Sequence, residues 1–355
     1  MKLLITGICG FVGSSLAREL KEHIAGIEIL GLDNLSRPGS ELNRRGLSKF
    51  ASRIFHADIR NPSDLESLPA VDWVIDAAAN PSVLAGLGTE TSSRQVMEHN
   101  LVGTLHLLEY CKQHKSGLIM LSTSRVYSLE RLASLLMENA GSAFVPKHGL
   151  IKEPGFSVSG VAETFSTMPP LSLYGAAKLA SELVIMEYGS AFQLPVHINR
   201  CGVLAGAGQF GKPDQGIFSF WIHSHRQRRP LKYIGFGGSG FQVRDCLHPR
   251  DLAGLVAKQL QQPRKSSPPL NVSGCSSSAT SLNELTQWCD HRFGSHPVSS
   301  SAEARPFDVP WLVLDSAQAE KAWDWRPQIS REQIFEEIAL HAEANPGWLE
   351  LSKDS

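Results

Sequence analysis

Residues 2–20 read KLLITGICGFVGSSLAREL, and this stretch decides the fold. The apolar run Lys2–Thr6 predicts a short buried strand, and the pattern over Phe11–Glu22 predicts a helix. Between them stands a GxxGxxG motif formed by Gly7, Gly10 and Gly13. A glycine-rich turn that joins a strand directly to a helix is typical of a loop that binds a dinucleotide pyrophosphate.

Each glycine of this turn has its own physical role. Gly7 permits the tight turn, Gly10 lets the backbone approach a pyrophosphate, and Gly13 allows close packing of the helix. The helix N-terminus then offers free N–H groups and a positive dipole end to the phosphates.

An acidic residue follows at a suitable distance. Asp33 comes directly after the next predicted strand, Glu28–Leu32. Its carboxylate can accept hydrogen bonds from the adenosine ribose and would repel a 2′-phosphate, which favours NAD over NADP. Two alternatives remain: Asp33 is a plain turn residue, or Arg37 holds a 2′-phosphate. Asp58, in HADIR, is a candidate for binding the adenine amino group.

Strands and helices alternate along the N-terminal part of the chain. Further strands are predicted at Ile54–Ala57, Trp73–Ala77, Gly117–Ser122 and Val196–Asn199, and helices at Arg94–Lys115 and Tyr174–Phe192. This order predicts an α/β fold with a Rossmann-type doubly wound parallel sheet.

From about Gly206 the alternation fades, and helical patterns at Ser281–Phe293 and Ser330–Glu343 predict a smaller C-terminal α+β substrate domain. We expect residues 1–206 to bind NAD, with a return segment around 241–258, and residues 207–355 to form mainly the substrate-binding domain.

The segment 128–171 is too long for a bare loop. Within it, LERLASLLMENA (129–140) predicts a short helix, and the insertion is expected to shape a substrate pocket. The glycine-rich GFGGSG (235–240) has no helix start after it and predicts a turn between strands.

Composition indicates a globular protein, because 42% of the 355 residues are apolar and 19% are charged. A net charge of −1 provides no field for nucleic acid or an anionic membrane, so neither partner is expected, and the basic HRQRRPLKY (225–233) is interpreted as solvated surface. No run approaches about 18 apolar residues, so no membrane span is expected. Six scattered cysteines predict reduced thiols in a cytoplasmic protein, and the lone His223–His225 pair predicts no metal site.

The stretch SLYGAAK (172–178) places Tyr174 and Lys178 four apart, on one face of a helix. Spacing alone also fits an ordinary surface pair. Beside a bound nicotinamide, the ammonium and the positive ring favour the phenolate, which accepts a hydroxyl proton while hydride leaves the same carbon. Thr123 can hydrogen-bond the same oxygen, or is an ordinary strand-end hydroxyl. Asn100 supports the central helix or a water relay, or else caps a helix.

Several motifs together resemble one known family. They are TGICGFVG, LDNLSR, HADIRN, NLVGTLHLLE, STSRVY and YGAAK, followed by GQFGKPDQG (208–216), FQVRDCLHPRDL (241–252), NVSG (271–274) and WRP (325–327). Almost end to end, the chain resembles the extended short-chain dehydrogenase/reductases of the NAD-dependent nucleotide-sugar epimerase and dehydratase family. DNLSR, DQG and QVRD are most similar to its CDP-paratose 2-epimerase branch.

The resemblance implies NAD as cofactor, a nucleotide sugar as substrate, and roles for particular residues. The implied catalytic group is Thr123, Tyr174 and Lys178. The implied cofactor-binding residues are Gly7, Gly10, Phe11, Val12, Gly13, Asp33, Asn34, Ser36, Arg37, Asp58, Ile59, Ala77, Ala78, Ala79, Asn100, Tyr174 and Lys178. The implied substrate-binding residues are Ser124, Arg125, Arg200, Gln209, Gln215 and Arg244, and no metal is implied.

The two residues after Thr123 bear on the reaction. By resemblance, 4,6-dehydratases carry Asp-Glu there and decarboxylases keep a Glu, whereas this chain has Ser124 and Arg125. We therefore expect epimerisation, by oxidation to a keto sugar and re-reduction on the opposite face. A dehydratase, a simple dehydrogenase or reductase, and a non-catalytic dinucleotide-sensing module remain as alternatives. Asp76 and Ser128 depart from the His and Gly that the family commonly carries.

Two predicted helices have more apolar positions than one buried face requires. Examples on Arg94–Lys115 and Tyr174–Phe192 are Leu105, Leu108, Leu183 and Met186. Members of the resembled family commonly dimerise through these two helices, so a homodimer is expected. The alternative is that these side chains lie against the sheet.

Overall fold

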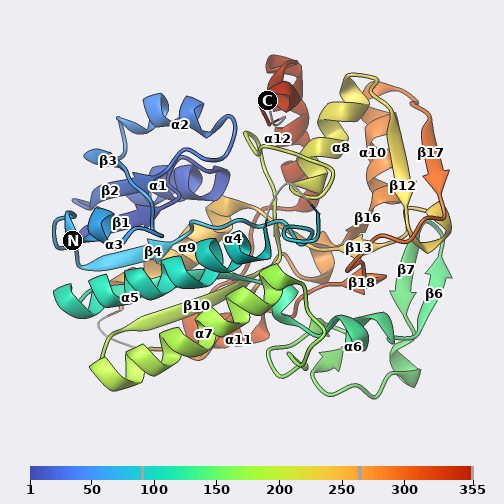
Figure 1. Ribbon diagram of the computed structural model, residues 1–355. Helices are drawn as coiled ribbons and strands as arrows, with labels where there is room; N and C mark the ends of the chain where they lie inside the picture. The colour runs from blue at the N-terminus through green and yellow to red at the C-terminus, as the bar shows by residue number, and fades with distance from the viewer. Residues whose placement is uncertain (89–91, 263–265, 353–355) are drawn as a thin grey trace.

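The structure is a computed structural model that describes residues 1–88, 92–262 and 266–352. Its centre is a parallel seven-stranded sheet in the order β15-β10-β5-β4-β1-β2-β3 (Figure 1). The strands are β1 (Lys2–Thr6), β2 (Glu28–Asp33), β3 (Arg53–His56), β4 (Trp73–Asp76), β5 (Gly117–Thr123), β10 (Val196–Cys201) and β15 (Leu270–Val272). The predicted fold class is confirmed. Sequence patterns identified six of these strands and missed β15, which is only three residues long.

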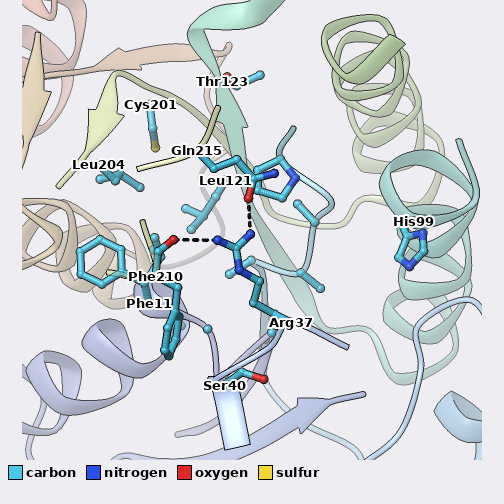
Figure 2. Close-up of a pocket in the computed structure, with 18 of the residues that line it drawn as sticks. Phe11, Arg37, Ser40, His99, Leu121, Thr123, Cys201, Leu204, Phe210 and Gln215 are labelled. Carbon is cyan, nitrogen blue, oxygen red and sulfur yellow. Dashed lines mark hydrogen bonds between the residues drawn. The ribbon is translucent and has the colours of Figure 1, made fainter. Parts of the chain in front are cut away.

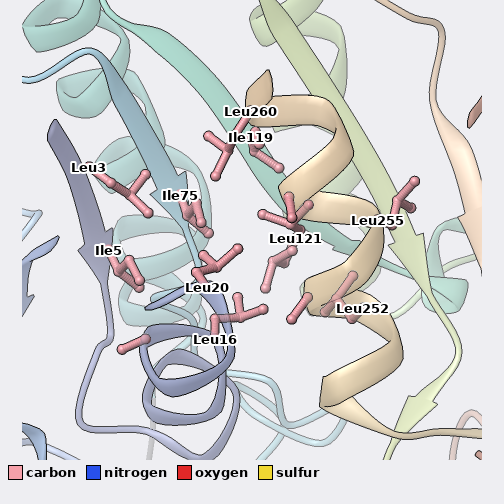
Figure 3. Packing of buried hydrophobic residues seen from close by; sticks show 14 of the residues in the cluster. Leu3, Ile5, Leu16, Leu20, Ile75, Ile119, Leu121, Leu252, Leu255 and Leu260 are labelled. Carbon is pink, nitrogen blue, oxygen red and sulfur yellow. The ribbon is translucent and has the colours of Figure 1, made fainter. Parts of the chain in front are cut away.

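Helices cover both faces of the sheet, and the alternation of β1 side chains shows why. Leu3 and Ile5 point to the face covered by α1 (Phe11–His23) and α9 (Pro249–Gln261), as Figure 3 shows. Leu4 points to the opposite face, which α5 (Gly103–His114) and α7 (Leu173–Phe192) cover. A strand buried on both faces needs apolar residues at every position, and this explains its continuous hydrophobic run.

The helix predicted over Arg94–Lys115 contains a π-helical turn. It consists of α4 (Ser93–Met97), the π turn Glu98–Val102 and α5. Asn100 lies inside the π turn, so the predicted alternative of a helix cap is wrong. Such turns often mark functional sites, because the extra residue displaces a side chain from the regular helix face.

The C-terminal part forms smaller sheets and helices at one end of the large sheet (Figure 1). Its helices are α8 (Ile217–Arg226), α10 (Leu282–Phe293) and α12 (Arg331–Ala344), followed by the 3-10 turn Trp348–Ser352. Helix α11 (Ala317–Trp323) instead packs against β15 and α9 on a face of the large sheet. Its strands pair as β12 (Leu231–Ile234) with β17 (Val298–Ser301), as β16 (Thr280–Ser281)-β13 (Val243–Arg244)-β18 (Trp311–Leu312), and as β11 (Val203–Leu204) with β14 (Cys246–Leu247). The turn predicted at 235–240 is confirmed, since it joins β12 to β13.

The helix predicted over 129–140 is only half correct. Helix α6 (Leu129–Ala133) ends early, and β6 (Met137–Ala140) pairs antiparallel with β7 (Ala143–Pro146). Gly141 takes a positive φ of 62° in the two-residue turn of this hairpin, a conformation that favours glycine. A second short pair, β8 (Phe156–Ser157) with β9 (Gly160–Val161), completes the insertion.

The remaining α-helices of the described residues are α2 (Ser40–Leu47), which contacts α1, and α3 (Pro62–Glu66), which contacts α5. Among the residues that the structure describes, no helix combines the length and apolar character that crossing a membrane requires.

Candidate active site

A cavity of about 400 Å³ opens at the carboxyl ends of the central strands. Its walls come from the glycine turn after β1, from the segments after β2, β3, β4 and β5, and from residues after β10. This is the edge at which ligands bind in open α/β sheets. Most of the predicted cofactor-binding residues line it, namely Gly7, Gly10, Phe11, Val12, Gly13, Asp33, Asn34, Ser36, Arg37, Asp58, Ile59, Ala77, Ala78, Ala79 and Tyr174.

The glycine turn is packed too tightly for larger residues. Gly7 has a φ of 62°, and a Cβ added to it would lie 3.0 Å from the Cα of Ala78. A Cβ on Gly13 would lie 2.3 Å from the Gly7 carbonyl oxygen. Helix α1 begins after Gly10 without a side-chain cap, so its first N–H groups remain open to a ligand. This bare helix end fits the pyrophosphate of a dinucleotide.

Asp33 is held rigidly at the end of β2. Its Oδ2 accepts a hydrogen bond from the Cys9 N–H (2.8 Å), and its Oδ1 accepts one from the Leu35 N–H (2.8 Å). Burial raises the pKa of Asp33, and the two backbone hydrogen bonds oppose this shift. Each carboxylate oxygen retains a lone pair for a ribose hydroxyl.

Arg37 does not turn back toward Asp33. Figure 2 shows its guanidinium directed at the segment after β10, where it donates to the Gln215 side chain and to the Phe210 carbonyl (2.7 Å). This orientation disfavours the alternative in which Arg37 holds a 2′-phosphate.

Asp58 is fixed by two neighbours. Burial alone would raise the pKa of its carboxyl, but hydrogen bonds from Arg60 and from Asn34 hold that pKa well below its usual range. A permanently charged carboxylate with its lone pairs partly engaged suits an adenine amino group.

Asn100 and Asp76 organise the backbone after β4. The Asn100 side chain accepts from the Asn80 N–H (3.0 Å) and donates to the Asn80 carbonyl (3.1 Å). Asp76 is fully buried and accepts from the hydroxyls of Thr104 (2.8 Å) and Thr6 (3.3 Å). Thr6 in turn accepts from the N–H groups of Ala77 and Ala78, so this network sets one cavity wall. Asn100 itself does not line the cavity.

Tyr174 and Thr123 both line the cavity and are joined by a hydrogen bond between their side chains. Ser172 caps α7 by accepting from the Gly175 N–H (3.0 Å), which places Tyr174 in the first turn. Burial raises the pKa of Tyr174 to about 12, while a hydrogen bond with Thr123 and the positive charge of Arg125 act in the opposite direction. Sequence reasoning had not connected Arg125 with this phenol.

Lys178 is buried on the same helix, four residues after Tyr174. Burial lowers the pKa of Lys178, and the negative charge of Asp76 is the largest influence opposing this shift, followed by Cys201 and Glu182. Asp76, one of the two noted departures from the pattern of the resembled family, therefore acts electrostatically on Lys178.

The predicted substrate residues divide into two groups. Ser124, Arg125, Gln209 and Gln215 line the cavity, whereas Arg200 and Arg244 do not. Arg200 forms a bidentate ion pair with Glu182 (Nη2–Oε2 2.7 Å) and donates to the Tyr127 hydroxyl (3.2 Å). A buried guanidinium needs a countercharge, and this engagement argues against the predicted substrate contact of Arg200.

Arg244 belongs to a cationic cluster that sequence reasoning only partly found. It donates to the Asp308 carboxylate (2.8 Å) and to the Val309 carbonyl (2.9 Å). Burial lowers the pKa of Arg125 to about 10, and the charges of Arg244 and Arg305 add to that shift while Asp308 opposes it. Three arginines around one aspartate leave an excess of positive charge suited to an anionic ligand.

Several lining residues were missed by sequence reasoning. Cys201 lines the cavity but belongs to no local motif, and Phe210 and Asp214 lie in the quoted motif GQFGKPDQG without having been assigned to the site. Within residues 1–88, 92–262 and 266–352, no three His, Cys, Asp or Glu side chains gather in a way that could hold a metal ion.

The sheet, the glycine turn and the bare helix end define a Rossmann-type dinucleotide-binding protein. Residues 3–273 match the model of the NAD dependent epimerase/dehydratase family. The chain therefore belongs to this family and uses NAD, which confirms the resemblance and the predicted cofactor.

Two curated relatives and one solved structure illustrate the likeness. The chain is 31% identical over 345 residues to a CDP-paratose 2-epimerase of Salmonella typhi, covering 93% of this chain and 96% of the relative. It is 27% identical over 349 residues to a UDP-glucuronate 4-epimerase of Thermodesulfobacterium geofontis, covering 93% and 92%. The dTDP-glucose 4,6-dehydratase DesIV of Streptomyces venezuelae, a double mutant with NAD and DAU bound, shares the fold with a TM-score of 0.80 and 24% identity, covering 99% of this chain and 100% of that chain.

Proposed function

We propose that this protein catalyses the NAD-dependent epimerisation of a nucleotide-linked sugar, as CDP-paratose 2-epimerases do. The supporting observation is the cavity wall beside Tyr174, where Thr123, Ser124 and Arg125 provide no carboxylate. Elimination of water needs an acid as well as a base, and decarboxylation by the family pattern uses a Glu at the position of Arg125.

The carboxylates elsewhere in the described lining are engaged. Asp33 is bound by two backbone N–H groups, Asp58 by Arg60 and Asn34, and Asp214 by the Ser82 hydroxyl (2.6 Å). The hydrogen bonds of these three carboxylates do not hold any of them next to Tyr174. This arrangement favours a reaction that needs only proton transfer at one hydroxyl.

In the proposed reaction, Tyr174 removes the proton from a sugar hydroxyl and later returns it. Bound NAD supplies the hydride acceptor and then the hydride donor. Thr123 hydrogen-bonds the reacting oxygen, while Lys178 and Arg125 supply positive charge that stabilises the phenolate. Burial raises the pKa of Tyr174 to about 12 even with the opposing charge of Arg125. The phenol therefore needs the further positive charge of Lys178 and of the bound nicotinamide ring to act as a base near neutral pH.

Arg125, Arg244 and Arg305 are proposed to bind the anionic part of the substrate, and the insertion 128–171 to close the pocket. A transient ketone must stay in place while its other face is presented, and a closed pocket meets this need. The division into an NAD-binding part (1–206, with 241–258) and a substrate-binding part is proposed on the same basis.

The test is proton NMR in deuterated water with CDP-, UDP- and GDP-sugars as candidate substrates. An inverted centre without solvent deuterium at that carbon is the expected result. Loss of water or of carbon dioxide would replace epimerisation by elimination or decarboxylation. Net release of NADH would indicate a simple dehydrogenase, and no turnover on any sugar would favour a dinucleotide-sensing module.

We further propose a homodimer formed through α5 and α7, which lie side by side (Figure 1). Leu183 and Phe192 on α7 are 56% and 43% exposed, and Leu105 and Met186 are partly buried. Leu108 does not contribute, because it lies fully in the core.

All six cysteines are free thiols, which agrees with a reducing cytoplasm.

A further inference from the structure

Residues 208–216 form a short arm that crosses the mouth of the cofactor cavity, and we call this segment the strap. Gln209, Phe210, Asp214, Gln215 and Gly216 of the strap all line the cavity. The Lys212 N–H donates to the Gln215 carbonyl (2.7 Å) and the Gln215 N–H donates back (3.1 Å). The strap is therefore a hairpin with a defined tip at residues 213 and 214 rather than a loose loop.

The root of the strap is anchored on the C-terminal segment. The Phe210 ring stacks on Trp348, with centroids 5.0 Å apart and an interplanar angle of 12°. The Trp348 Nε1–H donates to the Gln209 carbonyl (3.0 Å), and the Ser219 hydroxyl donates to the same oxygen (2.9 Å). Phe210 is 4% exposed, so this end is held by burial as well as by hydrogen bonds.

Further contacts of the strap are polar. At the tip, Arg305 donates to the Pro213 carbonyl (3.2 Å). Two others lie on the two sides of the glycine turn. On one side Arg37, which follows β2, donates to the Gln215 side chain and to the Phe210 carbonyl. On the other side Ser82, which lies beyond β4, donates to Asp214 Oδ2 (2.6 Å). In the sheet, β1 lies between β4 and β2. A strap joined to both flanks thus passes over the end of β1, where the glycine turn receives the pyrophosphate.

We propose that the strap retains NAD in the cleft between turnovers, and that the Ser82–Asp214 contact is a latch that opens whenever the cofactor enters or leaves. The apolar root at Phe210 and Trp348 stays fixed and serves as the hinge. The Ser82–Asp214 and Arg305–Pro213 contacts at the tip are polar and only partly buried, so they break at lower cost than the buried root. Retention of the cofactor does not depend on which sugar is the substrate.

The experiment measures entry and release of the cofactor rather than activity. Fluorescent NADH is bound to the full chain, and stopped-flow mixing gives its association rate and, after a chase with excess NAD, its dissociation rate. The variants are Ser82→Ala, Asp214→Ala and the double variant, because neither residue is assigned to the catalytic group. Ser67→Ala removes a serine hydrogen bond of similar length (2.8 Å to the Asp64 carbonyl) away from the strap and is the control.

A latch predicts that both rates rise together, because the closed strap blocks the path in each direction. We expect each single variant to accelerate association and dissociation by about tenfold, the size of one hydrogen bond to a charged group, with the dissociation constant changed less than about threefold. The double variant should match the single variants, because all three break the same contact.

Unchanged rates, or a faster release with unchanged association, would overturn the latch, since the second result describes an ordinary cofactor contact. Multiplication of the two single effects in the double variant would also overturn it. A slower association in any variant would also count against a latch. Thermal unfolding of every variant, compared with Ser67→Ala, shows whether such a slower association comes from damage to the fold.

Discussion

The Arg200 guanidinium and the Glu182 carboxylate form a bidentate ion pair in which both side chains are buried, with Nη2 and Oε2 2.7 Å apart. Glu182 also accepts a hydrogen bond from the Ser122 hydroxyl, the residue before Thr123. The pair therefore joins β10, β5 and α7, one helical turn beyond Lys178 of the proposed catalytic group.

Removal of one partner of this pair should lower the stability of the fold. Glu182→Gln leaves a buried guanidinium without a countercharge and should lower the free energy of unfolding by about 3–5 kcal/mol. Urea denaturation gives this value. Glu28→Gln removes an exposed partner of Lys2 (3.7 Å) and should cost less than about 1 kcal/mol. Equal losses in the two variants would contradict a structural role for the buried pair.

Tyr174→Phe should lower turnover by about 100-fold or more, because general acid–base catalysis at the sugar hydroxyl is lost. NAD binding, measured by calorimetry, should be retained. Tyr188→Phe is the matched control, since Tyr188 lies on the same helix and bonds Glu109 at the surface. Near-normal turnover of the Tyr174 variant would refute its assignment as the acid/base.

NAD should bind more tightly than NADP, because the buried Asp33 carboxylate lies where the ribose 2′-oxygen is expected and would repel a phosphate. Asp33→Ser should narrow this preference chiefly by weakening NAD binding. Calorimetric titration of both dinucleotides into wild type and variant checks this. Tighter binding of NADP by the wild type would show that Arg37, rather than Asp33, determines the cofactor preference.

Stability should fall as the pH is lowered from about 6.5 to 4. Burial lowers the pKa of His197 to about 4, and Trp73 stacks on its ring at 5.7 Å. In this window the unfolded state binds a proton that the folded state rejects, so the free energy of unfolding falls by up to about 1.4 kcal/mol per pH unit for this one residue.

Denaturant unfolding at several pH values measures the slope. His197→Phe should flatten it, whereas substitution of the exposed His23 by Gln should leave it unchanged. A variant slope identical to that of the wild type would show that His197 does not contribute to acid sensitivity.

Leu183→Glu should convert the proposed dimer to a monomer, because it places a charge on the most exposed large apolar side chain of α7. Light scattering should give twice the chain mass of 38.8 kDa for the wild type and about that mass for the variant. Leu340→Glu, at a 55% exposed position on α12, is the control and should remain a dimer. A monomeric wild type at micromolar concentration would rule out the proposed pairing.

Local sequence patterns predicted the features whose partners are close along the chain. The glycine turn, Asp33 after β2 and the Tyr174–Lys178 spacing each depend on a short segment whose geometry follows from residue type and periodicity. The same holds for six strands of the parallel sheet, because a strand buried on both faces requires a continuous apolar run. The helix expected over 129–140 failed for the converse reason: Gly141 and the pairing of β6 with β7 outweighed local helix propensity.

Contacts between distant segments were decided only by the tertiary structure. Ser82 and Asp214 are 132 residues apart, and Arg37 and Phe210 are 173 apart, so no periodicity connects them. The sequence presented Arg200 and Arg244 as equivalent candidates for the substrate, yet burial committed Arg200 to Glu182 and gathered Arg244 with Arg125 and Arg305 around Asp308. A buried charged side chain pairs with the countercharge that lies closest to it in the folded protein. Tertiary packing, rather than local sequence, determines which countercharge that is.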